Sequence, residues 1–222
     1  PAPTAALDPR FPRAFTGAPV FAPQDNLNTD ALYPGKYTYQ DDITPEKQAE
    51  VVMENYDPRF ASAVAAEVAK LAERQLPEGT RGGAILIGGY NFGTGSSREQ
   101  AATALKYAGV PVVLAGSFSD VFKRNAINNG LVCLQCADLV EDLTAEYARD
   151  GQRGRGGRRD GEISVMLEGA TLDLESGSGR VRLTLPDGKV KEYTTVPAGI
   201  GRSVQEIYVA GGLESWVKER LP

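Results

Sequence analysis

The sequence predicts an α/β fold in which a mainly parallel β-sheet is flanked by helices and followed by additional C-terminal strands. Three short apolar runs, at Gly83–Gly88, Val110–Ala115 and Leu131–Cys136, alternate with helical patterns at Ser96–Ala108 and Asp120–Asn129. Short apolar strands that alternate with helices are typical of parallel sheets joined by right-handed crossovers. The 222 residues are 41% hydrophobic and 24% charged, which is the composition of a globular protein with a buried core.

The first half of the chain predicts a lead-in, one strand and two helices. Residues 1–17 are rich in Pro and Ala and show no period, which indicates an extended lead-in or linker. A short strand is expected at Ala18–Ala22. A helix is expected over Pro45–Asn55, because Thr44 suits an N-cap and proline suits the first helical position. A second helix is expected from about Pro58 to Gln75, with one apolar face.

The second half predicts a helix, a linker and four strands within a single domain that spans residues 18–222. The Gly/Arg-rich segment 150–161 is expected to be a flexible linker, because this composition cannot bury apolar area. Ser203-x-x-Glu206 matches a capping box and is expected to begin the C-terminal segment. The other elements expected here are a helix at Asp138–Arg149, strands at Ile163–Leu167, Thr171–Leu174, Val181–Leu185 and Lys189–Thr194, and a turn at Pro186-Asp187-Gly188.

Charge and hydropathy argue against nucleic-acid and membrane partners. The chain carries 24 basic and 29 acidic residues, a net charge of −5, so its overall field repels nucleic acid and anionic membranes. The longest apolar runs have about six residues, against the ~20 that a spanning helix needs. The Pro-rich start has no signal-peptide pattern, and an excised or mature chain would lack such a segment in any case.

The residue types that are scarce restrict the chemistry. The chain has no His, and its only cysteines are Cys133 and Cys136. Two thiolates cannot complete a four-ligand zinc or iron–sulfur site, so no metal or cofactor is expected to bind this chain alone. In a strand, an offset of three residues points the two thiols to opposite faces. We therefore expect both to be reduced core thiols.

A glycine-rich segment, Gly88–Gln100, joins the first central strand to its helix, and it contains Asn91-Phe92-Gly93-Thr94-Gly95-Ser96-Ser97-Arg98. Glycines at this junction allow a sharp turn and leave backbone N–H groups free to face an anion. The segment is not a P-loop, because no Lys follows Gly95, and Arg98 replaces the third glycine of a dinucleotide fingerprint.

Two interpretations of the serines in this segment stay open. Ser96 and Ser97 each form a capping-box pattern with the Glu and Gln that follow, so either one could simply cap the helix. A cap needs one hydroxyl, so the second serine could face a substrate whose carboxylate suits the guanidinium of Arg98. Without His, such a serine could itself act as the base if nearby donors stabilised its alkoxide.

The segment 91–99, together with Asn28-Thr29-Asp30, resembles the swivel domain of the aconitase superfamily. The longer strings 25–42, 92–105 and 211–218 resemble specifically the C-terminal domain of the fungal mitochondrial homoaconitases. The resemblance covers most of the chain. It implies a hydro-lyase of the mitochondrial matrix that interconverts homocitrate and homoisocitrate through cis-homoaconitate in lysine synthesis.

The resemblance also implies a division of labour between domains. In this family a [4Fe-4S] cluster is held by three cysteines of other domains, where it acts on the substrate hydroxyl. The implied partners are therefore cluster-bearing aconitase-type domains, on the same polypeptide or on a large subunit, and a tricarboxylate substrate. On its own the chain would supply half of an active site and would be catalytically silent.

The resemblance implies roles for five residues. Ser96 matches the catalytic serine that exchanges the carbon-bound proton, and Asp30 matches an active-site aspartate. Ser97 and Arg98 match contacts to the substrate carboxylates. Lys36 is a weaker candidate for substrate binding, because family members vary in length just after the aspartate. On spacing alone, the aspartate could equally cap a turn and the lysine could be a solvated charge.

Substrate choice stays open at this point. Tyr33, Tyr37 and Tyr39 are candidates for a pocket that fits the extra methylene of homocitrate, although they could also simply edge the core. Such a pocket discriminates by only ~1–3 kcal/mol per methylene, so specificity for isopropylmalate or citrate is an alternative.

Two functions of other classes are also compatible with parts of the sequence. The five arginines of Arg149–Arg159 resemble the composition of an RNA-binding tail. A plain linker is favoured, because the run is short, lacks aromatic residues and lies in an acidic chain. A stand-alone anion-binding regulator built on the same glycine-rich segment is the third alternative.

Overall fold

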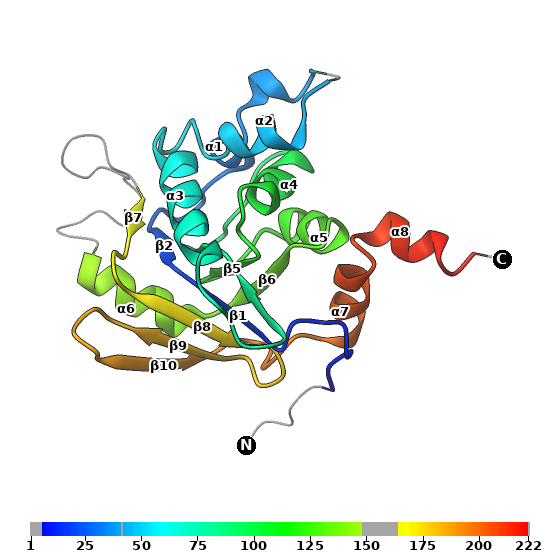
Figure 1. Cartoon of the computed structure of the whole chain (residues 1–222). Helices are drawn as coiled ribbons and strands as arrows, with labels where there is room; N and C mark the ends of the chain where they lie inside the picture. Colours follow the sequence, from blue (N-terminus) through cyan, green and yellow to red (C-terminus); the bar gives the residue numbers. More distant parts are fainter. Residues whose placement is uncertain (1–5, 41, 148–163, 222) are drawn as a thin grey trace.

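The computed structural model describes residues 6–40, 42–147 and 164–221, which form two five-stranded sheets with helices around them (Figure 1). One sheet has the strand order β10-β9-β8-β1-β3 and the other β6-β5-β4-β2-β7. The strands are β1 (Ala14–Gly17), β2 (Pro19–Ala22), β3 (Thr80–Gly82), β4 (Ile85–Gly88), β5 (Val112–Ala115), β6 (Val132–Gln135), β7 (Val165–Met166), β8 (Thr171–Glu175), β9 (Arg180–Thr184) and β10 (Val190–Thr194). The helices are α1 (Thr29–Leu32), the 3₁₀ helix η1 (Gly35–Tyr37), α2 (Pro45–Glu50), α3 (Phe60–Ala72), α4 (Gln100–Tyr107), α5 (Asp120–Asn128), α6 (Ala137–Tyr147), α7 (Arg202–Val209) and α8 (Leu213–Lys218).

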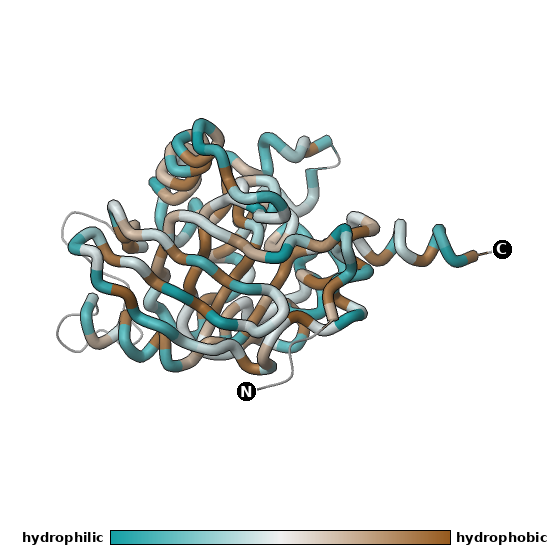
Figure 2. The backbone as a smooth tube through the Cα atoms, turned by 60° about the horizontal axis from the view of Figure 1, so that its bottom comes forward, coloured by the Kyte–Doolittle hydropathy of each residue, from teal (hydrophilic) through white to brown (hydrophobic). Residues whose placement is uncertain are grey.

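The predicted parallel sheet is confirmed. Strands β2, β4, β5 and β6 run parallel, and β7 adds one antiparallel strand beside β2. All four residues of β2, β4 and β5 are buried, because helices cover one face of this sheet and the second sheet lies against the other. The tube in Figure 2 shows these strands as predominantly hydrophobic segments.

The alternation of side chains along the strands separates two cores. Val20, Leu86, Val113 and Cys133 lie in register and pack with residues of α3, α4 and α5. The neighbouring positions of the same strands face the other sheet and α6, where Cys136 also lies. Both cysteines are buried and free, so the predicted core thiols on opposite faces are confirmed. Burial raises the pKa of the Cys136 thiol to about 11.

Two differences from the sequence prediction concern the first half of the chain. Strand β1 lies inside the expected lead-in and occupies the space between β8 and β3. Its partners are more than 60 residues away in the sequence, at Arg81 and Leu174, so no local pattern marks it. The division of the chain into residues 1–17 and 18–222 stays a prediction. The helix that begins after Thr44 is confirmed, but it ends at Glu50 instead of Asn55.

The C-terminal strands are confirmed, and the turn between β9 and β10 contains Gly188 with a φ of 83°. The prediction of a capping box at Ser203 is wrong, because α7 already begins at Arg202 and has Gly201 as its N-cap. The side chain of Glu206 instead accepts hydrogen bonds from Arg202, Trp216 and Arg220. The predicted linker 150–161 lies outside the described residues. In the described ranges no helix has the length and apolarity to span a membrane.

Candidate active site

Three loops meet at the carboxyl edge of the parallel sheet, where ligands usually bind in open α/β sheets. They follow β2, β4 and β5. The first two loops are joined by a bridge between Asn28 and Thr94, and the second and third by a bridge between Phe92 and Phe118. The sheet thus places the Asn28-Thr29-Asp30 segment beside the glycine-rich segment, as a common site requires.

The glycine-rich segment turns sharply at three residues in left-handed conformations, Asn91 with a φ of 53°, Gly93 with a φ of 75° and Gly95 with a φ of 96°. Gly93 N donates to Leu27 O at 2.8 Å. Thr29 N donates to Thr94 O at 2.9 Å, and the Thr29 hydroxyl donates to Ser96 O at 2.9 Å. The loop after β2 therefore fixes the backbone on both sides of Gly95.

The helix after this segment begins later than predicted. It starts at Gln100, and Glu99 occupies the N-cap position without a side-chain capping bond. The interpretation of either serine as a helix cap is therefore wrong. The physical reason is that Thr29 holds the Ser96 carbonyl, so this stretch follows the neighbouring loop and not the helix axis. Ser96 and Ser97 are both exposed, and the Ser97 hydroxyl accepts a hydrogen bond from Asn125 Nδ2 at 3.0 Å.

Asp30 connects the two motifs directly. Its Oδ1 accepts hydrogen bonds from Arg98 Nη1 at 2.7 Å and from Gly35 N at 2.9 Å. The bond to Gly35 is of the turn-capping kind, whereas the bond to Arg98 joins residues 68 positions apart in the sequence. The hydrogen bond from Arg98 holds the pKa of the Asp30 carboxyl below its usual range. Arg98 Nη1 also donates to Tyr33 O at 3.1 Å, so this guanidinium is fixed by groups on the loop after β2.

Lys36 is not a solvated turn charge without a partner. Its Nζ lies 2.6 Å from Glu54 Oε1, and the Tyr37 hydroxyl donates to Glu54 Oε2 at 3.1 Å. The hydrogen bond to Glu54 raises the pKa of Lys36. Of the three tyrosines, Tyr33 is fully buried in the helix-side core and Tyr39 is 91% exposed, so they do not line one pocket in this structure.

The structure therefore brings Asp30 and Arg98 into contact, with Ser96 and Ser97 immediately before the arginine. Lys36 lies one residue after Gly35 and is held by a separate ion pair. Sequence reasoning missed four supporting residues that contact these groups: Thr29, Glu54, Asn55 and Asn125. Only Thr29 lies inside a motif. The other three have no local sequence signal, because their partners come from distant segments.

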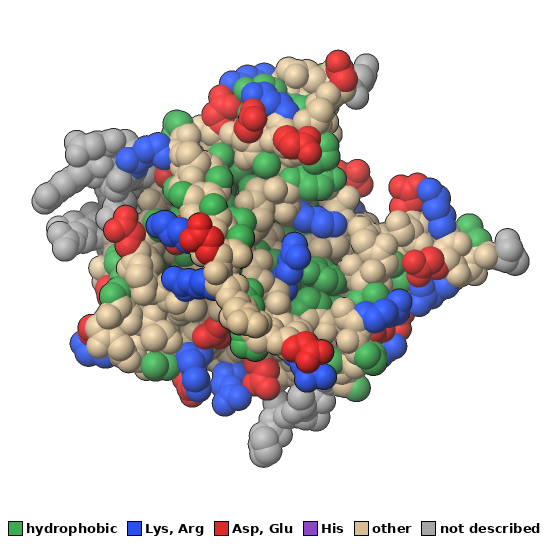
Figure 3. All heavy atoms as spheres, viewed as in Figure 1, with side chains coloured by type: hydrophobic (Ala, Val, Ile, Leu, Met, Phe, Trp, Pro, Cys, Tyr) green, Lys and Arg blue, Asp and Glu red, His purple; other side chains and the backbone are tan. Residues whose placement is uncertain are grey.

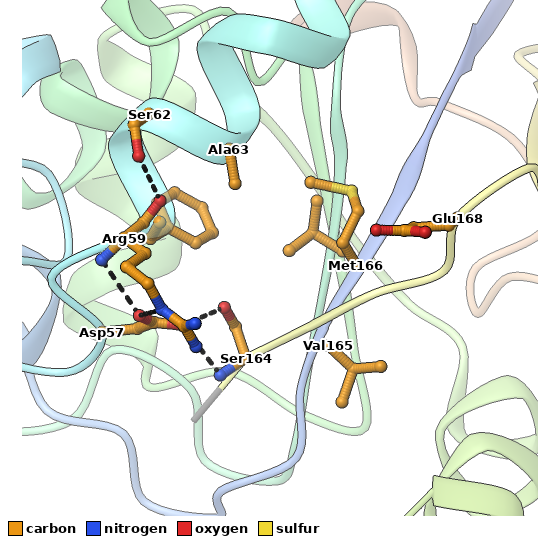
Figure 4. Close-up of a pocket in the computed structure, with 10 residues that line it drawn as sticks. Asp57, Arg59, Ser62, Ala63, Ser164, Val165, Met166 and Glu168 are labelled. Carbon is orange, nitrogen blue, oxygen red and sulfur yellow. Dashed lines mark hydrogen bonds and ion pairs between the residues drawn. The ribbon is translucent and has the colours of Figure 1, made fainter. Parts of the chain in front are cut away.

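A hollow of about 550 Å³ lies elsewhere, between α3 and β7 (Figure 4). At its edge the carboxylate of Asp57 accepts hydrogen bonds from Ser164 Oγ at 2.6 Å and from Arg59 N at 3.0 Å. Figure 4 shows Asp57, Arg59 and Ser164 facing one another, with Glu168 lying apart beside Met166, and none of the five candidate residues lines this hollow. We interpret the hydrogen bonds between Asp57 and Ser164 as structural, because they hold the start of β7 to the segment that leads into α3.

In the part of the chain that the structure describes, no set of three or more His, Cys, Asp or Glu side chains is placed to hold a metal ion. Cys133 and Cys136 are both buried and belong to separate cores. These residues do not fit an iron–sulfur cluster.

Comparison with known proteins gives consistent results for sequence and fold. The sequence is 61% identical over 215 residues to "Homoaconitase, mitochondrial" of Mycosarcoma maydis, covering 95% of this chain and 28% of that protein. It is 54% identical over 220 residues to the protein of the same name from Cryptococcus neoformans var. neoformans serotype D, covering 98% of this chain and 30% of that protein. The chain thus spans less than a third of the length of these relatives.

A solved structure is also similar. It is the 3-isopropylmalate dehydratase of Methanocaldococcus jannaschii, with a TM-score of 0.62 and 26% sequence identity over 93% of this chain and 95% of that chain. The family described as the aconitase C-terminal domain matches residues 5–139. This range includes the segments around Asp30 and Ser96, and the chain belongs to the aconitase C-terminal domain family.

Proposed function

We propose that this chain is the substrate-binding and proton-transfer half of a mitochondrial hydro-lyase that interconverts homocitrate and homoisocitrate through cis-homoaconitate in lysine biosynthesis. The names of the two relatives and their high identity support this substrate and a location in the mitochondrial matrix. The observation that carries the proposal is the exposed Ser96, which does not cap α4 and lies two residues from the Asp30–Arg98 pair.

In this proposal, Ser96 takes the proton from the substrate carbon. Its hydroxyl must be deprotonated to do so, and the positive charge of Arg98 and nearby backbone N–H groups would stabilise the alkoxide. When the proton moves from carbon to the Ser96 oxygen, the electron pair of the C–H bond forms the double bond of the intermediate. The C–O bond on the neighbouring carbon breaks as this double bond forms, and the hydroxyl leaves as hydroxide with the electron pair of that bond.

The substrate carboxylates are proposed to bind Ser97, Arg98 and Lys36. A guanidinium has five N–H donors, and in this structure Nη1 serves Asp30 and Tyr33. The remaining edge of Arg98 is therefore proposed for a carboxylate. Asp30 keeps that edge in a fixed orientation, which lowers the entropy cost of binding.

The electrophile for the departing hydroxyl is proposed to come from outside this chain. The described residues do not fit a cluster, and the chain spans only 28–30% of the two homoaconitase relatives. We propose that a [4Fe-4S] cluster, as this family implies, lies on cluster-bearing domains that close over the site. Those domains belong either to the same polypeptide or to a large subunit.

An isopropylmalate specificity is the second candidate, because the solved neighbour is named a 3-isopropylmalate dehydratase. An RNA-binding role has less support, since Figure 3 shows basic and acidic side chains interspersed over the face in view. The arginine run behind that alternative lies outside the described residues.

The proposed function is tested by combining the chain with the cluster-bearing portion of the protein. Hydration of cis-homoaconitate, cis-aconitate and isopropylmaleate is measured side by side, with the chain alone as control. We expect turnover only in the combined sample, and the highest kcat/KM with cis-homoaconitate. Turnover by the chain alone, or a preference for isopropylmaleate, would contradict the proposal.

A further inference from the structure

The turn that follows α2 has an unusual backbone and lies directly against the candidate site. Met53 is fully buried and adopts a left-handed conformation with a φ of 58°. Its N–H donates to Leu32 O at 2.8 Å, which ties the turn to the end of α1. A non-glycine residue rarely takes this conformation unless the surrounding structure requires it, and such residues concentrate at functional sites.

The two residues after Met53 both reach into the segment 30–37. Asn55 Nδ2 donates to Asp30 Oδ2 at 3.0 Å and to Asp30 O at 3.1 Å. Glu54 pairs with Lys36 at 2.6 Å and accepts a hydrogen bond from Tyr37. One dipeptide thus contacts two of the five candidate residues, although it lies in neither motif.

The contacts of Asn55 complement those of Arg98. Oδ1 of Asp30 is shared by Arg98 and Gly35, whereas Oδ2 is held by Asn55. With donors on both oxygens, the carboxylate cannot rotate freely about its Cβ–Cγ bond. Because Arg98 is paired to this carboxylate, the orientation of the guanidinium depends on Asn55 as well.

The contacts of Glu54 fix the lysine in a similar way. Lys36 has a flexible stem, and its side chain is 57% exposed. The two oxygens of Glu54 bind Lys36 and Tyr37 separately, so the ammonium group and the tyrosine ring are kept on the same side of η1. A substrate carboxylate would then meet an ammonium group that is already in place.

Resting on the proposed function, we propose that Glu54 and Asn55 are positioning residues of the active site, with Asn55 orienting the Asp30–Arg98 pair and Glu54 placing Lys36 for the substrate. Neither residue touches the reacting atoms in this account. The Met53 turn is the element that presents both side chains to the site.

The test compares Asn55→Ala and Glu54→Gln in the protein combined with its cluster-bearing portion. Asn55→Ala is expected to lower kcat/KM about tenfold, because a loosened guanidinium binds the transition state less well. The acid limb of the pH dependence of kcat/KM should move to higher pH in this variant, since Asp30 loses a hydrogen-bond donor that favours its charged form. Glu54→Gln is expected to raise KM severalfold with little change in kcat.

Glu50→Gln serves as the matched control for Glu54→Gln. Glu50 lies on α2 and, within the described residues, forms an ion pair with the exposed Lys47, so the kinetics of Glu50→Gln should match those of the unaltered protein. All three variants are also unfolded with urea. Wild-type kinetics and an unmoved pH profile in Asn55→Ala would overturn the proposal, as would losses of activity that simply follow losses of stability.

A second measurement separates this proposal from the proposed function. The carboxyl carbon of Asp30 is titrated by NMR in the chain alone, with and without Asn55→Ala. We expect the variant to raise the pKa of Asp30, whatever substrate the protein uses. If the combined protein is inactive on all three acids but this shift occurs, the function fails and the positioning contact stands. An unchanged pKa would overturn the role of Asn55.

Discussion

Replacement of Gly93 by Ala is expected to destabilise the fold by about 2–5 kcal/mol. A Cβ at Gly93 would lie 2.2 Å from Phe122 Cγ and 2.5 Å from Phe122 Cβ. Phe122 is 1% exposed and packs against Phe92 and Phe118, so its ring has little room to move. Overpacking of a core costs about 1–3 kcal/mol, and the left-handed backbone of Gly93 adds about 1–2 kcal/mol for Ala.

Gly95→Ala is the matched control in the same loop. Gly95 is also left-handed, with a φ of 96°, but the nearest atoms to its Cβ would be 3.7 Å away. Only the backbone cost of about 1–2 kcal/mol therefore applies. Urea unfolding followed by circular dichroism gives both free energies. Equal losses in the two variants would refute the argument, because only Gly93 faces the aromatic core.

Three further predictions concern buried or paired groups. Asp57→Ala should cost about 2–4 kcal/mol in urea unfolding, because the N–H and hydroxyl of Ser164 lose their buried partner; a loss below about 0.5 kcal/mol would contradict this. Burial raises the pKa of the Cys133 thiol, so a thiol reagent should label it far more slowly in the native protein than in urea, and equal rates would count against the fold. Arg98 lowers the pKa of Asp30, so this pair stabilises the fold above the unfolded carboxyl pKa of about 3.9. The stability difference between wild type and Asp30→Asn should therefore shrink as pH falls through the folded pKa, and a constant difference would argue against the pair.

The parallel sheet could be predicted because its signals are local. Continuous apolar runs mark strands that are buried on both faces, and left-handed glycines such as Gly130 and Gly188 end or turn the elements between them. Strand β1 has no such signal, since four residues of ordinary composition become a strand only through pairing with β3 and β8.

That Asp30, Ser96 and Arg98 lie on adjacent loops could be predicted, but their contacts could not. Ser96 and Arg98 could be placed in one loop from the glycine spacing, while the choice of Asp30 rested on family resemblance. The predicted start of α4 was wrong because the capping-box pattern describes only local hydrogen bonds. In the structure, the Thr29 hydroxyl donates to the Ser96 carbonyl, and Asp30 accepts a hydrogen bond from the Arg98 guanidinium. Thr29 and Asp30 both lie in a different loop from the residues they contact.

The supporting residues could not be found from the sequence for a similar reason. Glu54, Asn55 and Asn125 are common polar residues in ordinary surroundings along the chain. Their contacts with the site depend on the left-handed turn at Met53 and on the packing of α5 beside α4. Such contacts become visible only when the three loops are assembled on the sheet edge.

The central proposal is that the Ser96 side chain, as an alkoxide, accepts a proton in catalysis and has no structural role. It is tested most directly by measuring kcat and the free energy of unfolding for Ser96→Ala in the protein combined with its cluster-bearing portion. General-base catalysis contributes about 10²–10⁴-fold, so kcat should fall by that factor. The free energy of unfolding should stay within about 0.5 kcal/mol, because Ser96 is exposed and does not cap α4. A kcat within tenfold of wild type, or a fall in kcat that parallels unfolding, would contradict the claim.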